Sequence, residues 1–293
     1  NAACSGFIYA LTIADKFIQT FETRGLNTPD KELRPFTVNR ASATGLAGLA
    51  WNPDPYWTLK ASAATGFRAP NLAELSSNGL HEGIFRYEVG SPDLHPEQNL
   101  NLDLTVQRHG AVFSAAVSGF VNRFRQYIYL APTGEDYFGF PVFRFFQSGA
   151  TLYGGEATAR LDFGAVEWNN SFAWVRGRRE DDANLPFIPA PRLKSRVAYT
   201  PVFRQKGQKL TVFAEAEEVL EQSHPARYET STPAYFLLHG GVRLVFSGKR
   251  PLEVQLQGRN LLDNRYFDHL SRFKNFGIYE PGRDVAVSAR IHF

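Results

Sequence analysis

Apolar and polar residues alternate one by one along most of the chain, the pattern of β-strands with two different faces. The clearest run is 99–108, where leucine or valine alternates with asparagine, aspartate, threonine or glutamine. Comparable runs occupy 56–66, 111–129, 142–163, 166–176, 192–200, 209–220, 235–246, 252–259 and 285–293. The runs 7–22 and 36–51 are less regular. A helix is the alternative for 7–22, and we interpret both runs as strands. The pattern therefore predicts an all-β chain of about twelve strands.

The connections between these runs alternate between short and long. The short ones are 52–55, 109–110, 164–165, 205–208 and 247–250. The long ones are 24–35, 67–98, 130–141, 177–191, 221–233 and 260–282. Antiparallel strands joined in this order place all short turns at one end and all long loops at the other. That asymmetry is typical of outer-membrane β-barrels.

The polar face carries formal charges at Glu156, Arg160, Lys194, Arg196, Glu215, Glu217, Glu253 and Arg259. A soluble β-sandwich, such as an adhesin, buries its apolar face and exposes its polar one. A membrane barrel turns the apolar face to lipid, and alternation alone does not separate the two. Aromatic residues in positions that resemble interfacial girdles favour the membrane barrel: Trp57, Trp168, Trp174, Tyr199 and Tyr235.

Composition narrows the classes further. Aromatic residues make up 14% of the 293 residues, and no apolar run reaches the ~18 residues of a membrane helix. The net charge of +3 is too small to indicate nucleic-acid binding. Cys4 is the single cysteine, so no internal disulfide forms. The chain begins at Asn1 without a signal peptide, so we expect a processed chain or a fragment.

Several motifs resemble one family. Thr65–Leu75 reads TGFRAPNLAEL, and Pro92–Gln98 reads PDLHPEQ. Gly258–Tyr266 reads GRNLLDNRY, and Pro281-Gly282-Arg283 precedes a last strand that ends in Phe293. Together they resemble TonB-dependent outer-membrane receptors, and 122–130, 153–156 and 188–192 are also similar. The resemblance covers 36–293. Residues 1–35 match poorly, and we predict a first strand and a loop there.

The resemblance implies an antiparallel transmembrane β-barrel of about twenty-two strands. About twelve C-terminal strands lie in this chain, and the resemblance places the plug domain and the TonB box outside it. It implies a location in the bacterial outer membrane and active import of a scarce metal or metal complex with TonB-supplied energy. The implied partners are outer-membrane lipid, the TonB complex through the missing N-terminal region, and the barrel-assembly machinery through Phe293. The rival is a passive porin or structural outer-membrane barrel protein.

The long loops carry the candidate substrate-binding residues. His81, Glu82 and His95 lie in the first loop after the 56–66 strand, and Asp268 and His269 in the last loop. Imidazole and carboxylate groups suit zinc or copper, so His81, His95 and His269 are candidate ligands for an ionic metal or a haem iron. The alternative is that they are solvated loop histidines without a role. The run Ser77–Gly83 is similar to receptors assigned to zinc, haem or copper.

A ferric siderophore would instead use aromatic and arginine contacts, which Phe85, Arg86 and Tyr87 offer. The hypothesis places ionic metal or haem ahead of a siderophore. Arg68-Ala69-Pro70 and Pro92-Asp93 are expected to shape the loop, and Arg259 and Asn260 to make structural contacts at a strand end.

No signal for enzymatic chemistry is found. The chain lacks a glycine-rich phosphate loop, a nucleophile elbow and a metal-binding pair at i, i+4 spacing. We therefore expect no enzyme and no covalently bound cofactor, with zinc, haem or a ferric siderophore as transported cargo.

Overall fold

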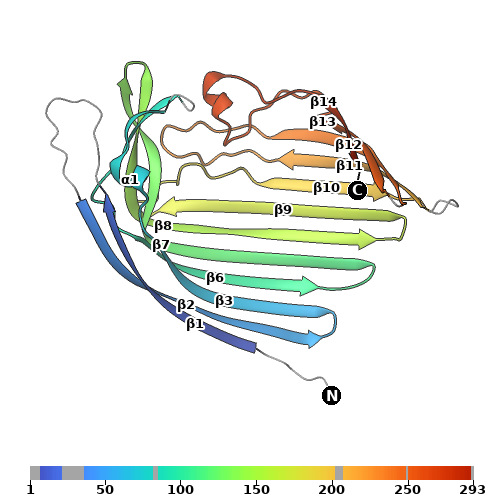
Figure 1. The fold of residues 1–293 in the computed structure, drawn as a ribbon, viewed down its shortest axis with the longest axis horizontal. Coiled ribbons are helices and arrows are strands. Elements are labelled where there is room, and N and C mark those ends of the chain that lie inside the picture. The colour runs from blue at the N-terminus through green and yellow to red at the C-terminus, as the bar shows by residue number, and fades with distance from the viewer. Residues whose placement is uncertain (1–6, 22–35, 82–84, 202–206, 249, 292–293) are drawn as a thin grey trace.

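A computed structural model describes residues 7–21, 36–81, 85–201, 207–248 and 250–291, with side chains from Thr44 onward. Its main feature is one curved β-sheet whose strands follow the chain order (Figure 1). The strands of the main path are β1 (Phe7–Phe21), β2 (Phe36–Asp54), β3 (Trp57–Arg68), β6 (Glu97–Arg108), β7 (Phe113–Tyr137), β8 (Phe140–Asp162), β9 (Val166–Arg179), β10 (Arg192–Tyr199), β11 (Gln208–Val219), β12 (Tyr235–Phe246), β13 (Leu252–Arg259) and β14 (Asp284–Ile291).

Each strand of this path pairs antiparallel with the next, and the path contains the twelve strands that the alternation predicts. Within the described residues no pairing joins β1 to β14, so the sheet is open there. The short strands β4 (Asn78–His81) and β5 (Arg86–Val89) lie off the path, with helix α1 (Leu72–Ser76) before them and the 3₁₀ helix η2 (Arg272–Phe276) in the last loop. No helix among the described residues is long and apolar enough to cross a membrane.

The apolar side chains of the strands point outward and the polar side chains inward, as in a membrane barrel. On β6, the side chains of Leu100, Leu102 and Leu104 are 46%, 49% and 57% exposed. The polar residues between them are less exposed and face the other side of the sheet. A soluble sandwich would bury these leucines, so the structure contradicts that alternative. An apolar outer face is stable where lipid, not water, surrounds it.

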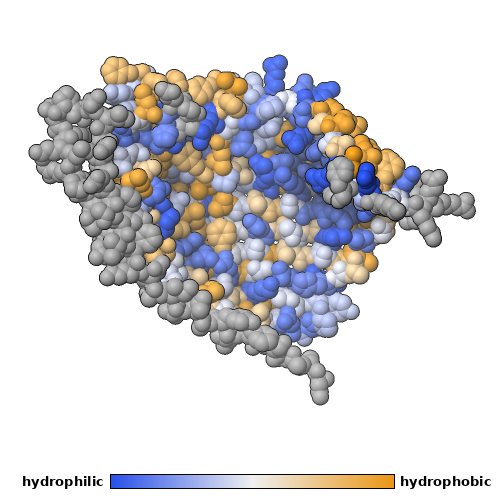
Figure 2. Space-filling view, viewed as in Figure 1, coloured by the Kyte–Doolittle hydropathy of each residue, from blue (hydrophilic) through white to orange (hydrophobic). Residues whose placement is uncertain are grey.

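The predicted end asymmetry is confirmed. Short connections at 55–56, 109–112 and 163–165 lie at one end of the sheet, and the long connections 69–96, 180–191, 220–234 and 260–283 lie at the other (Figure 1). Figure 2 shows that hydrophilic side chains gather over β10–β12 on the viewed face. The predicted turn at 205–208 falls largely outside the described residues, as do the loop 24–35 and Phe293.

Several local predictions were wrong. The loop expected at 130–141 is the upper part of a long hairpin, because β7 continues to Tyr137 and β8 begins at Phe140. The turn consists of Phe138 and Gly139, whose φ angles are 51° and 86°. Positive φ at both turn residues matches the twist of paired strands. The strand β9 likewise runs to Arg179, into the loop expected from Gly177.

The predicted turn at 52–55 is also displaced, because β2 runs to Asp54 and the turn is Pro55-Tyr56. Asp54 Oδ1 accepts hydrogen bonds from the backbone N–H of Tyr56 and Trp57, at 2.7 and 3.0 Å. This side chain closes the turn in place of the expected proline pair. The pairing is also not antiparallel throughout, since β5 pairs parallel with β8.

The direction of Tyr235 was assigned incorrectly. Its neighbour Phe236 lies on the outer face and is 41% exposed. Tyr235 therefore points to the inner face, because successive side chains of a strand alternate. Its hydroxyl donates a hydrogen bond to Asp268 Oδ2 at 3.1 Å, so it is a loop contact and not a girdle residue.

The exposed leucines of β6 give a direct test of the face assignment. Leu104→Arg places a charge among lipid chains and is expected to cost about 2–4 kcal/mol of unfolding free energy. Its matched control is Thr105→Arg, which places the same side chain on the inner face and is expected to have little effect. Urea unfolding of the full receptor in lipid vesicles measures both. Equal destabilisation by the two substitutions would contradict the assignment.

Candidate functional site

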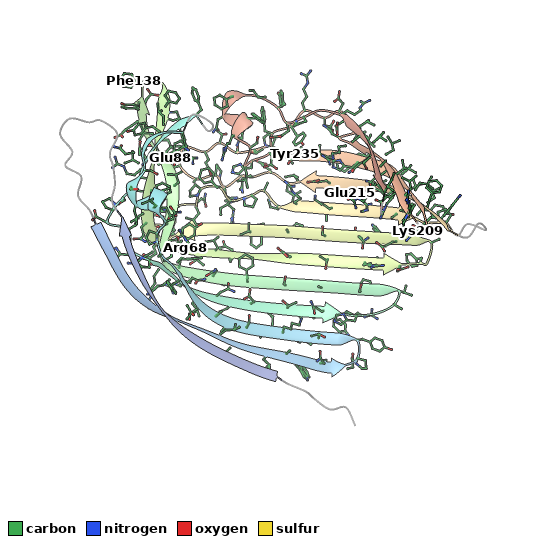
Figure 3. All side chains as sticks on the ribbon, in the orientation of Figure 1. Arg68, Glu88, Phe138, Lys209, Glu215 and Tyr235 are labelled. Carbon is green, nitrogen blue, oxygen red and sulfur yellow. The ribbon has the colours of Figure 1, made fainter. Side chains whose placement is uncertain are left out.

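The loop end of the sheet is organised by one arginine at the end of β3. Arg68 Nε donates a hydrogen bond to Glu97 Oε2 at 2.8 Å, and Arg68 NH1 donates to both carboxylate oxygens of Glu74 at 2.9 and 2.8 Å (Figure 3). Glu74 and Glu97 are buried, at 7% and 5% exposure. The remaining Glu97 oxygen accepts a hydrogen bond from the backbone N–H of Ile128 on β7. Arg68 and its two carboxylate partners therefore connect four segments of the chain: β3, α1, β6 and β7.

The same cluster begins helix α1. Asn71 Oδ1 accepts from the backbone N–H of Glu74 at 2.9 Å, and Glu74 Oε2 accepts from the backbone N–H of Asn71 at 2.7 Å. This reciprocal pair is a capping box. Pro70 is fully buried beside it. The prediction that Arg68-Ala69-Pro70 shapes the loop is therefore confirmed.

The first long loop is folded and lies on the tall hairpin of β7 and β8. A small apolar core forms where Leu75 and Leu94 of the loop contact Ile128 of β7, with Phe145 of β8 against it. Strand β5 adds to β8 in parallel, with Tyr87 opposite Val142. The loop is therefore held by its own secondary structure and by the hairpin.

Three of the predicted site residues lie together in this loop. The Phe85 ring contacts the Phe140 ring at a centroid distance of 4.7 Å and the Phe276 ring at 5.5 Å. Tyr87 packs on Tyr137 at 4.5 Å. Arg86 donates a hydrogen bond to the buried Glu88 at 2.6 Å. Phe85 and Tyr87 thus form one aromatic surface with the hairpin and the last loop. Arg86 points to the opposite face of β5, where it pairs with Glu88 and lies over the Phe143 ring at 5.0 Å.

The structure does not bring the predicted histidine ligands together. His81 lies at the end of β4, with Nε2 at 3.4 Å from Glu88 Oε2, and His95 is exposed with its backbone bonded to the Gln147 side chain. Glu82 lies outside the described residues. In the described part of the chain, one group of three potential metal ligands has its atoms within 4.8 Å, and it contains neither His81 nor His95.

Asp268 and His269 connect the last loop to other elements. Asp268 Oδ2 accepts from Arg192 on β10 at 2.9 Å as well as from Tyr235. The His269 side chain is only 3% exposed, and its Nδ1 lies 2.8 Å from Thr232 Oγ1. Burial lowers the pKa of His269, so the ring is neutral at pH 7. Both residues are structural contacts between loops in this arrangement.

Further hydrogen bonds join the three connections 180–191, 220–234 and 260–283. The buried Gln222 side chain donates to the carbonyl oxygen of Ile188 at 2.8 Å. Lys274 Nζ donates to the carbonyl oxygen of Thr230 at 2.6 Å and to Thr232 Oγ1 at 2.7 Å. Together with the Phe85–Phe276 ring contact, these bonds connect the four long connections 69–96, 180–191, 220–234 and 260–283 into one layer, hereafter the loop layer.

The group of three potential metal ligands lies on the inner face of the sheet, and all three side chains already have partners in the protein. It consists of Glu215, Glu217 and His239. Glu217 pairs with Arg192 at 2.8 Å and with Lys194 at 3.3 Å. His239 Nδ1 accepts from the backbone N–H of Asn260, so its proton sits on Nε2, which faces Glu217 at 3.6 Å. No lone pair of the ring remains for a cation, and this group is an ion-pair network.

Sequence reasoning missed the aromatic residues of the hairpin. Tyr137, Phe138 and Phe140 surround Gly139, and Phe138 is 85% exposed at the tip, where Figure 2 shows a hydrophobic surface. Figure 3 places Phe138 at the upper end of the hairpin, beyond Glu88. The run Tyr137–Phe140, with its glycine between aromatic residues, is the signal that identifies this turn.

Comparison with known proteins identifies the class. Residues 16–261 match the family model described as TonB dependent receptor-like, beta-barrel. The chain is 25% identical over 257 residues to the iron-regulated outer membrane virulence protein of Vibrio cholerae, covering 83% of this chain and 38% of that protein. It is 23% identical to a probable TonB-dependent siderophore receptor, PirA, of Acinetobacter baumannii, covering 84% of this chain and 39% of that protein.

Solved structures show the same fold. The copper transporter OprC superposes with a TM-score of 0.79 at 20% identity, over 98% of this chain and 45% of that one. The FrpB iron transporter of Neisseria meningitidis superposes with a TM-score of 0.70 at 15% identity, over 97% and 43%. The chain thus has the fold of part of an outer-membrane β-barrel, and it spans about two fifths of the length of the curated relatives it matches. The chain belongs to the TonB-dependent receptor family, whose members reside in the bacterial outer membrane.

Arg68 gives the first test of the site. Arg68→Gln leaves two buried carboxylates without their cation and is expected to cost about 3 kcal/mol, the lower end for breaking a buried ion pair, because Arg68 itself is partly exposed. The triple variant Arg68→Gln, Glu74→Gln, Glu97→Gln removes the stranded charges and should recover much of the loss. Urea unfolding in vesicles measures both. A triple variant less stable than the single one would contradict this account.

His269 predicts a pH dependence of the loop layer. Its pKa in the folded loop lies below the unfolded value of about 6.5. Between the two values the unfolded loop binds a proton and the folded one does not, so the stabilisation is complete above about pH 6.5 and is lost as pH falls through the folded pKa. Hydrogen exchange of residues 266–276, corrected for intrinsic rates, should accelerate from pH 7.5 to 5. His269→Gln should flatten this response, whereas His224→Gln, an exposed histidine in the adjoining loop, should leave it unchanged.

Proposed function

We propose that this chain forms part of a receptor that imports iron as a complex with an organic chelator, using energy supplied through TonB. The observation that carries the proposal is the aromatic surface at the loop end. It consists of Phe85, Tyr87, Tyr137, Phe138, Phe140 and Phe276. Ferric siderophores present flat and often aromatic groups, and such groups stack on aromatic rings.

Backbone geometry supports a binding role for this surface. Phe85 and Phe138 both have a φ of 51°, in the left-handed region that bulky residues avoid. Phe138 also leaves a large ring in contact with solvent. Two unfavourable features at one exposed position are typical of a residue retained for a contact with another molecule.

The ligand chemistry of the loops favours a metal complex over a bare metal ion. A zinc or copper site requires about four ligand atoms close together. Among the described residues, His81 and His95 lie outside any such group, and His269 is bonded inside the loop layer. The names of the relatives, an iron-regulated protein and a siderophore receptor, point the same way. Haem stays the second candidate, because the exposed His81 and His95 can offer an axial ligand.

The proposal includes partners beyond this chain. Outer-membrane lipid contacts the apolar outer face, the TonB complex acts through a region outside these residues, and Phe293 is the proposed signal for barrel assembly. A passive porin is the competing function, and it predicts ligand flux without TonB. Uptake of labelled ligand by cells with and without TonB separates the two.

Ligand binding to the full-length receptor tests the substrate class. Calorimetry with a ferric catecholate, a ferric hydroxamate, haem, Zn²⁺ and Cu²⁺ is expected to detect a ferric siderophore. The double variant Tyr87→Ala, Phe138→Ala should weaken this binding about fivefold to a hundredfold, because each ring contact contributes about 0.5–1.5 kcal/mol. Tyr56→Ala, an exposed aromatic at the turn end, is the matched control and should bind as wild type.

A second pair of substitutions tests the histidines. His81→Ala with His95→Ala should leave siderophore binding intact. If wild type binds haem or zinc instead, and this double variant loses that ligand, the siderophore proposal is wrong and the histidine hypothesis is right.

A further inference from the structure

The upper part of the β7–β8 hairpin departs from the direction of the other strands. Phe124 pairs with Ala150 and Tyr127 with Ser148, so β7 advances by three residues while β8 advances by two. An extra residue in one strand is a β-bulge, which bends the strand. Figure 1 shows the loop-end part of β7 and β8 turned steeply away from the direction of the neighbouring strands. The bulge therefore separates the part of the hairpin in the sheet wall from an upper part, 127–147.

The bend carries unfavourable features on both strands. Gln126 has a φ of 93°, which residues other than glycine rarely adopt. On β8, the buried hydroxyl of Ser148 has no hydrogen-bond partner among the described residues. Gln147 Nε2 donates to the carbonyl oxygen of Gln126 at 3.0 Å and holds the strands together beside them. Backbone strain and an unsatisfied buried hydroxyl at one bend are typical of a segment with a second arrangement.

The upper hairpin forms one body with the connection 69–96. Leu75 and Leu94 pack on Ile128, and β5 pairs with β8. The Gln147 side chain accepts from the backbone N–H of His95 at 3.0 Å and donates to its carbonyl oxygen at 2.6 Å. We call the upper hairpin with α1 and β5 the lid. The Arg68 cluster lies at its foot, because the Ile128 N–H is bonded to Glu97 of β6.

A second body lies opposite the lid and consists of the connections 180–191, 220–234 and 260–283. Besides the bonds of Gln222 and Lys274, the Glu229 carboxylate joins two of these connections. It accepts hydrogen bonds from the backbone N–H of Phe187 at 2.8 Å and of Ala226 at 2.9 Å. The second body is therefore held together by hydrogen bonds of its own, independently of the lid.

The contacts between the two bodies are few. The Phe85 and Phe276 rings meet at a centroid distance of 5.5 Å, and the Tyr228 hydroxyl donates to the carbonyl oxygen of Thr133 at 3.4 Å, a long hydrogen bond. Across the described residues, no further hydrogen bond, ion pair or ring contact links the bodies. Phe85 and Tyr228 have φ angles of 51° and 72°, so each contact includes a bulky residue in the left-handed region.

We propose that the lid swings about the bulge at Gln126, and that it parts from the second body to admit ligand to the inner face of the sheet. The seam is the line at which they part, because it has two contacts whereas each body is bonded throughout. Phe276 belongs to the second body and the other rings of the aromatic surface to the lid. Closure therefore completes this surface around a ligand. The motion itself needs no ligand, whereas its role in admission rests on the proposed function.

Electron–electron double resonance on the full-length receptor without ligand tests the motion. Spin labels are attached at Glu135→Cys on the lid and Arg272→Cys on the second body, both exposed, with Cys4 replaced by serine. Gln126→Gly should raise the ratio of closed to open lid about fivefold, because glycine adopts this φ without strain. Tyr228→Phe should lower the ratio about fivefold, because the hydrogen bond to Thr133 is lost.

Tyr56→Phe is the matched control, since it removes an exposed tyrosine hydroxyl at the turn end, and it should leave the distances unchanged. Circular dichroism checks that each variant is folded. Opposite shifts by Gln126→Gly and Tyr228→Phe support the hinge and the seam. Distances that neither substitution changes, or that both change in the same direction, would overturn the lid.

Uptake of a labelled ferric siderophore tests the role in admission. Thr133→Cys with Tyr228→Cys, bridged by a reducible bifunctional thiol reagent, should slow uptake about tenfold or more, and reductant should restore it. Asn78→Cys with Val89→Cys, a directly paired set within the lid, should import at the wild-type rate when bridged. Unimpaired uptake across a bridged seam would overturn the role in admission. Failure of wild type to import any ferric siderophore would contradict the proposed function alone, because the distances decide on the lid without ligand.

Discussion

Each strand in a bilayer must satisfy its backbone N–H and C=O groups with neighbouring strands, because lipid offers no partner. This constraint sets the architecture of the molecule. Twelve strands pair in chain order, and the side chains then divide by alternation into a lipid-facing and an inner set. The inner set is free to carry charge, and it does so as a paired network around Glu217. Ion pairing there neutralises charges that would otherwise face one another across adjacent strands.

The loop layer depends on the sheet through Arg68. Its guanidinium joins α1, β6 and, through Glu97, the β7 backbone. The aromatic surface at the loop end is held by loops that pair with β8 and with one another, not by isolated chain segments. A binding surface on such a support is presented in a defined arrangement, which lowers the entropy lost when a ligand binds.

Alternation allowed the strands, their number and their faces to be predicted, because a period of two extends over many residues. Local features could not be predicted where tertiary contacts, and not a periodic sequence pattern, determine the structure. The hairpin above Ile128 is covered by the first loop on one side, so its pattern at 130–141 is not a simple alternation. Tyr235 was placed with the girdle because a tyrosine at a strand end fits both faces, and only its neighbour Phe236 identifies the side.

The candidate site was less predictable than the fold. Phe85 and Tyr87 were chosen for their chemistry and do lie together, but their partners Tyr137, Phe140 and Phe276 come from distant segments. Arg86 was chosen with them, yet it pairs with Glu88 on the other face of β5. His269 has the imidazole side chain of a metal ligand. In the structure this side chain instead contacts Thr232, which also bonds to Lys274, so His269 makes a structural contact within the loop layer. Residue type is visible in a sequence, whereas three-dimensional neighbours of a loop residue are not.

The ring contact between Phe85 and Phe276 has a consequence for the order of assembly. It joins the connection 69–96 to the connection 260–283, so it forms only after the strands that flank both connections have paired. Contacts between distant segments are slow to form, because the intervening chain must first be ordered. The aromatic surface at the loop end is therefore completed late in folding, after the strands on both sides of these two loops have paired.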